Sequence, residues 1–284
     1  MKVNLKLEPT LHESDILSLP FEVVNDAAKG DNVPYISAGV SSSLPKVAVV
    51  IGYIDNPADK GAKIYITPKN IVYAAENAGF CPIFVSYDKI ESQIYNISPA
   101  GVLLPGGMFQ LPSQYIYNWI EDGTYHPDLR RFNTYIALLN YAVKQKLPTL
   151  ALCAGMQIVA CEMGGKLQTK INQNLQEGMV NHYSKDPKYS HNVFVVNESL
   201  LNKVTGEETL AVNSRHNSAL AEMRYVDYQV TARAEDGVPE AVEPKVPWSK
   251  FALGVEWHPE DRAIANPDSP DAKIFKAFAK SISR

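Results

Sequence analysis

The sequence predicts an α/β protein with three layers: a mostly parallel central sheet with helices on both faces, and short added strands in the second half. In the first half of the chain, short apolar runs bounded by turn residues alternate with amphipathic stretches of helical period. This alternation is typical of parallel strands covered by helices on both faces. In the second half, short strand-like runs follow one another with few helical stretches between them. We interpret these runs as strands added to the same sheet.

The predicted domain begins at residue 45. Residues 1–44 have a mixed, weakly periodic sequence that ends in a Gly- and Ser-rich stretch, which is typical of a loop or linker. We therefore expect residues 1–44 to form an N-terminal extension and residues 45–284 to form the domain. Its first strand is expected at Lys46–Gly52, and a helix is expected to begin at Thr67 and Pro68, as N-cap and first-turn proline.

Strands and helices continue to alternate along the rest of the chain. The clearest helix is predicted for Asp128–Lys146, where apolar residues recur at spacings of three and four, and a last helix follows Ser269 and Pro270. The remaining strands are expected at Pro82–Ser86, Gly101–Leu104, Pro148–Leu152, Asn192–Asn197, Thr209–Asn213, Asp227–Ala232 and Phe251–Trp257.

Composition excludes several classes of protein. The chain has 284 residues, 45% of them hydrophobic, with a net charge of −4 and a pI near 5.9. It has no Lys- and Arg-rich run, so we expect no nucleic-acid partner. No run is long enough to span a bilayer and the N-terminus lacks the apolar core of a signal peptide, so we expect a cytoplasmic protein without a membrane partner. The three cysteines, without CxxC spacing, predict neither a disulfide framework nor a cysteine-based zinc site.

Cys153 is the first candidate for chemistry. It follows the predicted strand Pro148–Leu152 and precedes Ala154, Gly155 and a helical pattern. A sharp strand-to-helix turn would expose the sulfur, and the N-terminus of the following helix would favour the thiolate. The alternative is a buried cysteine that packs as a small hydrophobic side chain, which is how we interpret Cys81 and Cys161.

A histidine and a carboxylate follow the predicted strand Phe251–Trp257. His258 and Glu260 are separated only by a proline, and both would lie at the carboxyl end of a strand, as Cys153 does. A cysteine nucleophile needs a base near its sulfur and a third group that orients the base. The backbone N–H groups of Ala154 and of Gly107, in the turn after Gly101–Leu104, could hold an oxyanion. The alternatives are an ordinary loop histidine and a surface carboxylate.

Several strings together resemble a known family. They are LLPGG (103–107), LPTLALCAGMQ (147–157), GGKL (164–167), AVNSRH (211–216), ARAEDGVPEAVE (232–243) and LGVEWHPE (253–260). In this order they resemble the class I glutamine amidotransferase-like superfamily, over roughly residues 45–284. More narrowly, they are similar to its free-standing γ-glutamyl hydrolase branch, which includes the γ-glutamyl-γ-aminobutyrate hydrolases.

The resemblance implies a flavodoxin-like fold and a hydrolase that acts on a small γ-glutamyl amide through a cysteine thioester, with no metal and no organic cofactor. It implies a catalytic triad of Cys153, His258 and Glu260, an oxyanion hole from Gly107 and Ala154, and a homodimer. Residues that would contact the substrate are Gly106, Gln157, Arg215 and His216. We interpret the domain of residues 45–284 accordingly as a class I glutamine amidotransferase-like hydrolase domain.

Three departures from the branch concern substrate recognition. Ala154 stands where the branch often has arginine, Met108 and its neighbours replace acidic residues, and only His216 remains where a pair of histidines is common. The amine that leaves is therefore not assigned. Two alternatives stay open: a glutaminase that passes ammonia to a partner synthase, and a catalytically silent binding protein. The spacing of His12, His126, His182 and His191 suggests no metal site.

Overall fold

The structure is a computed structural model of the whole chain. It describes residues 21–26, 35–36, 43–55, 63–87, 89–121, 123, 125–173, 175–184, 186 and 189–282. Most of the predicted N-terminal extension, residues 1–44, and with it His12, lies outside the described residues. No helix in the described part of the chain is long and apolar enough to cross a membrane.

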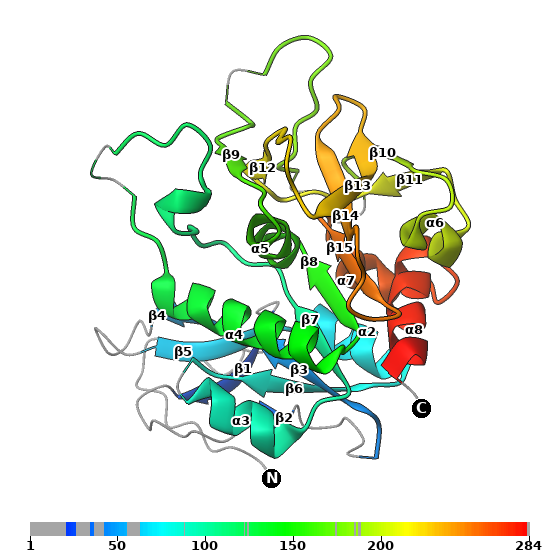
Figure 1. Cartoon of the computed structure of the whole chain (residues 1–284). Coiled ribbons are helices and arrows are strands. Elements are labelled where there is room, and N and C mark those ends of the chain that lie inside the picture. Colours follow the sequence, from blue (N-terminus) through cyan, green and yellow to red (C-terminus); the bar gives the residue numbers. More distant parts are fainter. Residues whose placement is uncertain are drawn as a thin grey trace, which may run out of the picture.

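A ten-stranded sheet forms the centre of the molecule (Figure 1). Its middle is parallel, as expected for short apolar strands that are buried on both faces. The sheet order is β11-β10-β13-β14-β15-β8-β7-β3-β6-β2. The parallel strands are β3 (Lys46–Val50), β6 (Cys81–Val85), β7 (Gly101–Leu104), β8 (Thr149–Leu152) and β15 (Ala252–Val255).

Antiparallel strands extend this parallel centre on both sides. On the β15 side the added strands come from the second half of the chain, as the turn-rich sequence predicts, and the fold class is confirmed. They are β10 (His191–Val195), β11 (Thr209–Val212), β13 (Tyr228–Ala234) and β14 (Pro239–Pro244), and at the opposite edge β2 (Tyr35–Ile36) pairs with β6.

Two sets of helices cover the sheet, one on each face (Figure 1). In one set, α3 contacts α4 and α4 contacts α5; in the other, α2, α7 and α8 contact one another and α6 packs on α8. The first set is α3 (Ile90–Ile97), α4 (Leu129–Gln145) and α5 (Ala154–Glu162). The second is α2 (Lys69–Ala78), α6 (Leu200–Thr205), α7 (Pro259–Ala263) and α8 (Pro270–Ile282), and a 3-10 turn, η2, spans Ser113–Tyr115.

The predicted helix ends are largely explained by capping. Asp128 accepts a hydrogen bond from the Arg131 N–H at 3.0 Å, and Ser269 accepts one from the Ala272 N–H at 3.1 Å. Each cap satisfies a donor that the first turn of a helix leaves free. Cys81 and Cys161 are buried in the core, as predicted.

The region around Thr67 is where the sequence prediction is wrong. Thr67 and Pro68 end a strand, β5 (Lys63–Pro68), and helix α2 begins one residue later. The β-branched residues Ile64, Ile66 and Thr67 favour the strand. Here β5 pairs with β4 (Gly52–Asp55) on one side and with β1 (Phe21–Asp26), from the extension, on the other.

A final two-stranded pair shapes the region near Cys153. β9 (Leu167–Thr169) pairs antiparallel with β12 (Ser218–Leu220). Two isolated bridges, Ile116 to Leu167 and Tyr183 to Arg215, tie further loops to this pair. Segments far apart in the sequence are thereby brought together at the carboxyl ends of β7 and β8.

Candidate active site

Cys153 occupies the tight turn between β8 and α5. Its backbone has φ 47° and ψ −112°, a conformation that costs a residue with a side chain energy and that is found mainly at functional sites. The turn is held from both sides, since the Cys153 N–H donates to the Val255 carbonyl at 2.8 Å and the Cys153 carbonyl accepts from the Gln157 N–H at 3.0 Å. The surrounding hydrogen bonds therefore fix the strained residue in place.

Gly155 makes this turn possible. A Cβ atom at this position would lie 2.1 Å from the carbonyl oxygen of Leu104, closer than atoms can approach. The absence of a side chain lets the start of α5 lie against the end of β7. The cysteine turn and the glycine turn that follows β7 are thus brought close to each other.

His258 lies between a carboxylate and the cysteine. Its Nδ1 is 2.8 Å from Oε1 of Glu260, and its ring also makes a hydrogen bond with Cys153. His258 is the N-cap of α7, and Pro259 begins the helix, which carries Glu260 in its first turn. The structure thus brings together the three residues that the sequence analysis predicts as a triad.

The charge of this group follows from its contacts. Burial of the imidazole disfavours its charged form, but the charge of Glu260 and the hydrogen bonds with Cys153 and Glu260 outweigh burial and raise the pKa of His258 to about 10. At neutral pH His258 is therefore a cation beside the sulfur. Such a neighbour stabilises a thiolate.

Asn213, which the sequence analysis did not single out, holds the backbone of His258 at both ends. Its Oδ1 accepts from the His258 N–H at 2.9 Å, and its Nδ2 donates to the His258 carbonyl at 3.1 Å. Asn213 is completely buried, so these two bonds are shielded from water. The only sequence signal was its place in the AVNSRH string, which carries the resemblance.

The glycine turn after β7 contacts the same group. A Cβ atom on Gly106 would lie 2.8 Å from Cε1 of His258 and 3.2 Å from Cβ of Cys153, so the backbone of Gly106 packs directly against both. The turn is anchored from α4, because the Tyr135 hydroxyl donates to the Pro105 carbonyl at 2.8 Å.

A cavity of about 640 Å³ opens beside Cys153. This volume suits a small-molecule ligand. Five further residues predicted for the site line it: Gly107, Ala154, Gln157, Arg215 and His216. Gly106, His258 and Glu260 are not among the lining residues, and Gly106 meets the site only through its contact with Cys153 and His258.

The lining residues have partners of their own. Nη1 of Arg215 lies 2.6 Å from Oδ2 of Asp261, while Arg215 is still about one third exposed. Gln157 donates to the carbonyl of Ser218 at 3.1 Å and also to Glu256. These contacts hold both side chains in defined positions at the cavity wall.

Glu256 is a buried carboxyl group close to the site that the sequence analysis did not consider. It is completely buried. Burial and the negative charges of Cys153 and Glu240 raise the pKa of Glu256 well above its usual range, and the hydrogen bond from Gln157 offsets this only partly. These surroundings favour the neutral, protonated form of Glu256 over the carboxylate.

The mostly parallel sheet and the family match together place the chain among the class I glutamine amidotransferase-like proteins. The chain belongs to the Peptidase C26 family, which matches residues 47–260. The family and its hydrolase members identify the protein, at this coarse level, as an amide hydrolase.

Relatives of two kinds are similar to the chain. It is 31% identical over 214 residues to the γ-glutamyl-γ-aminobutyrate hydrolase PuuD of Escherichia coli (strain K12), a match covering 71% of this chain and 81% of that protein. It is 28% identical over 224 residues to the glutamine amidotransferase-like protein YvdE of Lactococcus lactis, covering 76% of this chain and 89% of YvdE.

A solved structure shares the fold. The glutaminase domain of Trypanosoma brucei CTPS, with bound acivicin, aligns with a TM-score of 0.57 at 16% identity, over 84% of this chain and 94% of that domain. This likeness confirms the α/β architecture.

Proposed function

We propose that the protein hydrolyses the γ-glutamyl amide bond of a small molecule through a thioester on Cys153. One observation carries the proposal: the imidazole of His258 contacts both the carboxylate of Glu260, at 2.8 Å, and Cys153, beside a cavity that Cys153 lines. Membership of the Peptidase C26 family and similarity to a γ-glutamyl-γ-aminobutyrate hydrolase support it.

In the first half of the proposed reaction, the Cys153 thiolate attacks the amide carbonyl carbon. The negative charge that develops on the carbonyl oxygen is held by the backbone N–H groups of Gly107 and Ala154. The C–N bond then breaks, and the His258 imidazolium gives its proton to the leaving nitrogen. The amine departs, and the γ-glutamyl group remains bound to sulfur as a thioester.

In the second half, water hydrolyses the thioester. His258, now neutral, accepts a proton from the water molecule as it attacks, and the C–S bond breaks to release glutamate and the thiolate. Glu260 accepts a hydrogen bond from Nδ1 of His258 throughout, which directs the other ring nitrogen to the reacting atoms. Each step needs only water and the amide.

The two parts of the substrate are proposed to face different walls of the cavity. The wall from β9 and the segment before β12 presents polar groups, among them Lys170, Arg215 and Asn217, which suit the charged α-amino acid end of a γ-glutamyl group. The other wall, formed by residues 107–111 and 116–120, presents Phe109, Trp119 and other apolar side chains. The amine part is therefore proposed to carry an apolar or extended carbon chain.

The experiment is an assay of the purified full chain against γ-glutamyl amides of γ-aminobutyrate, putrescine and an aromatic amine, and against glutamine. The α-glutamyl amides of the same amines are the matched controls. We expect release of glutamate from γ-linked compounds only, with a γ-glutamyl adduct on the protein detectable by mass spectrometry after acid quench. Absence of both turnover and adduct across the panel would refute the proposal.

A glutaminase that supplies a partner synthase is the second candidate, because YvdE is described as glutamine amidotransferase-like. It predicts that glutamine is hydrolysed only after a partner protein is added. Turnover of larger γ-glutamyl amides by the isolated chain favours the hydrolase. A chain that binds γ-glutamyl compounds but never acylates would be the silent binding protein.

A further inference from the structure

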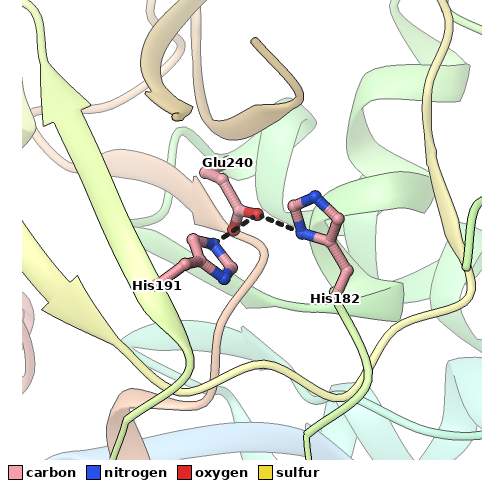
Figure 2. A group of neighbouring side chains, drawn as sticks. All are labelled: His182, His191 and Glu240. Atoms are coloured by element: carbon pink, nitrogen blue, oxygen red, sulfur yellow. Dashed lines mark hydrogen bonds and ion pairs between the residues drawn. The ribbon is translucent and has the colours of Figure 1, made fainter. Parts of the chain in front are cut away.

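A second group of histidines surrounds a carboxylate, Glu240, and only its member His216 lines the cavity beside Cys153. His182, His191, His216 and Glu240, here called the Glu240 cluster, are each at most 3% exposed. Nδ1 of His182 and Nε2 of His191 both lie 3.1 Å from Oε1 of Glu240, and Nε2 of His216 lies 3.4 Å from the same oxygen. Figure 2 shows the rings of His182 and His191 directed at one end of the Glu240 side chain.

Hydrogen bonding alone does not account for the cluster. Nδ1 of His216 lies 2.9 Å from the Ser218 carbonyl oxygen, which can only accept a hydrogen bond, so Nδ1 carries the proton. In a neutral ring Nε2 then has a lone pair, and this lone pair faces Oε1 of Glu240. His182 faces carboxylates with both ring nitrogens, Nε2 with Asp236 at 3.1 Å and Nδ1 with Glu240 at 3.1 Å, so a neutral ring can donate to only one of them. Two lone pairs that face one another repel unless a cation lies between them.

Four buried side-chain atoms of the cluster have no hydrogen bond among the described residues. They are Nδ1 of His182 and Nε2 of His216, which face Oε1 of Glu240, and Oε2 of Glu240 and Nδ1 of His191. A buried polar atom without a partner is costly, and the two nitrogens that face the same carboxylate indicate a common missing partner. Two imidazole lone pairs and a carboxylate oxygen are ligands that divalent transition metals accept.

The distances also fit a metal site. Zinc binds imidazole nitrogen and carboxylate oxygen at about 2.0–2.2 Å, so two ligands of a tetrahedral site lie about 3.3 Å apart. The three separations from Oε1 of Glu240, 3.1, 3.1 and 3.4 Å, are close to this value. The ligand atoms of His182, His191 and Glu240 all lie within 4.8 Å of one another.

A second shell is present as well. Asp236 is 3.1 Å from Nε2 of His182, the nitrogen on the far side from Glu240, and it also accepts from the Val180 N–H at 3.1 Å. A carboxylate in this position fixes the orientation of a metal-binding histidine and raises its basicity.

We propose that the Glu240 cluster binds one Zn²⁺ or a similar divalent transition metal ion, with His182, His191 and Glu240 as ligands and His216 as the fourth. The site is closed and buried, so the ion has a structural role and takes no part in the reaction. It joins four segments: strand β10 through His191, strand β14 through Glu240, the loop that carries His182, and the loop before β12 that carries His216. The last loop also carries Arg215 and lines the cavity beside Cys153.

The test measures metal binding to the full chain in a Cys153→Ser background, because Cys153 and His258 could themselves bind zinc. Metal is removed with a chelator, and Zn²⁺ is titrated in competition with a chromophoric chelator. We expect one tight equivalent, a raised melting temperature on loading, and with Co²⁺ the intense visible bands of a tetrahedral complex. None of these measurements depends on catalysis. The metal proposal can therefore fail while the proposed hydrolase activity is confirmed, and the hydrolase proposal can fail while metal binding is confirmed.

Variants place the ion within the cluster. His191→Gln and Glu240→Gln should abolish the tight equivalent, and Asp236→Asn should weaken it by about 10–100-fold. His126→Gln, at an exposed histidine, is the matched control and should bind as the parent does. Because the buried variants could fail to fold, the partly exposed Asp236 provides the second measurement. Absence of stoichiometric zinc and of a tetrahedral cobalt spectrum in the parent, or equal binding by folded His191→Gln, overturns the proposal.

Discussion

Two buried histidine–carboxylate groups lie close to the neighbouring strands β14 and β15, and they are built for different tasks. At the end of β15, His258 faces one carboxylate, Glu260, and the reactive side chain of Cys153. On β14, Glu240 is surrounded by three imidazoles and is completely buried. The residue types are the same, and each group reaches the cavity through one member, Cys153 in the first and His216 in the second, but only the first holds a nucleophile.

The difference teaches that the partners of an imidazole, and its access to a ligand, decide its role. His258 has one ring nitrogen fixed by Glu260, which leaves the other for proton transfer to a substrate. The ring of His182 is held on both sides by carboxylates, Asp236 and Glu240, and no ring atom is left for a substrate. The following predictions test this division, beginning with the largest expected effect.

Cys153→Ser should lower kcat/KM for the best γ-glutamyl amide by at least about 10⁴-fold, because loss of a nucleophile in a triad leaves only the contribution of binding and the oxyanion hole. The melting temperature should stay near that of the parent, since the substitution is nearly isosteric. Cys161→Ala, at a buried cysteine outside the cavity, is the control and should keep its activity. Comparable loss in both variants would mean that the assay reports folding and not a nucleophile.

Glu260→Gln should lower kcat/KM by about 10⁴-fold at neutral pH, as loss of the orienting carboxylate does in other triads. It also removes the charge that raises the pKa of His258 to about 10. Alkylation of Cys153 by iodoacetamide, followed against pH, should therefore lose the thiolate–imidazolium plateau at neutral pH. An unchanged alkylation profile would contradict the assigned contact.

The same pKa predicts how stability depends on pH. His258 has a folded-state pKa raised above its ordinary value of 6.5, so its charged form stabilises the fold fully below about pH 6.5, and this contribution is lost as the pH rises to about 10. Urea unfolding of the parent should show a loss of free energy of unfolding over this window. The loss should be smaller in Glu260→Gln, and equal losses in the two proteins would assign the effect to other groups.

Asn213→Ala should lower kcat by about 10²-fold with little change in KM, because it releases both backbone contacts that position His258 without touching the substrate. The measurement is the split between kcat and KM, with Asn217→Ala, at the cavity wall, as the comparison. Asn217→Ala is expected to raise KM and to leave kcat nearly unchanged. If Asn213→Ala lowers the melting temperature but leaves kcat per folded molecule unchanged, Asn213 has only a structural role.

The sequence predicts the Cys153–His258 group but not the Glu240 cluster, and the reason is physical. Cys153 and His258 follow short apolar strands of a parallel sheet, and the carboxyl ends of such strands meet at one edge, so their proximity follows from order along the chain. His182 lies in a loop and Glu240 on an antiparallel strand. Their meeting depends on the pairing of β10 with β13 and of β13 with β14, which residue spacing does not encode.

Prediction of the fold is limited in the same way: elements with strong local patterns are predicted, and pairings between distant segments are not. Strong local signals located β7, β8, α4 and the final helix to within about a residue or two. The small sheet of β1, β4 and β5 was missed, because β1 comes from the extension and pairs with β5 across a long stretch of sequence, and because Thr67 and Pro68 also resemble the start of a helix. Likewise Asn213 and Glu256 matter through buried contacts that form only in the folded chain.

Arg215→Gln tests which residue at the cavity wall binds the substrate. The Arg215 guanidinium lines the cavity while paired with Asp261 at 2.6 Å, so its loss should raise KM by about 10-fold, the usual value of one hydrogen bond to a charged group, with kcat little changed. Steady-state kinetics with a γ-glutamyl amide, and with its analogue lacking the α-carboxylate, give the measurement. An equal KM increase for both compounds would place Arg215 away from the carboxylate.

His191→Gln should have the smallest effect on activity and so gives the clearest contrast between the two groups. His191 contacts Glu240 at 3.1 Å and does not line the cavity, so the reaction should keep its pH profile and kcat. Stability should fall by about 1–3 kcal/mol, because a buried carboxylate loses a partner. Urea unfolding and pH-dependent kinetics on the same preparation separate the two effects.

His126→Gln is the control, since this exposed side chain should alter neither property. A shift of the alkaline limb of activity in His191→Gln would mean that the Glu240 cluster communicates with His258, and the division between a chemical and a structural histidine group would then be wrong.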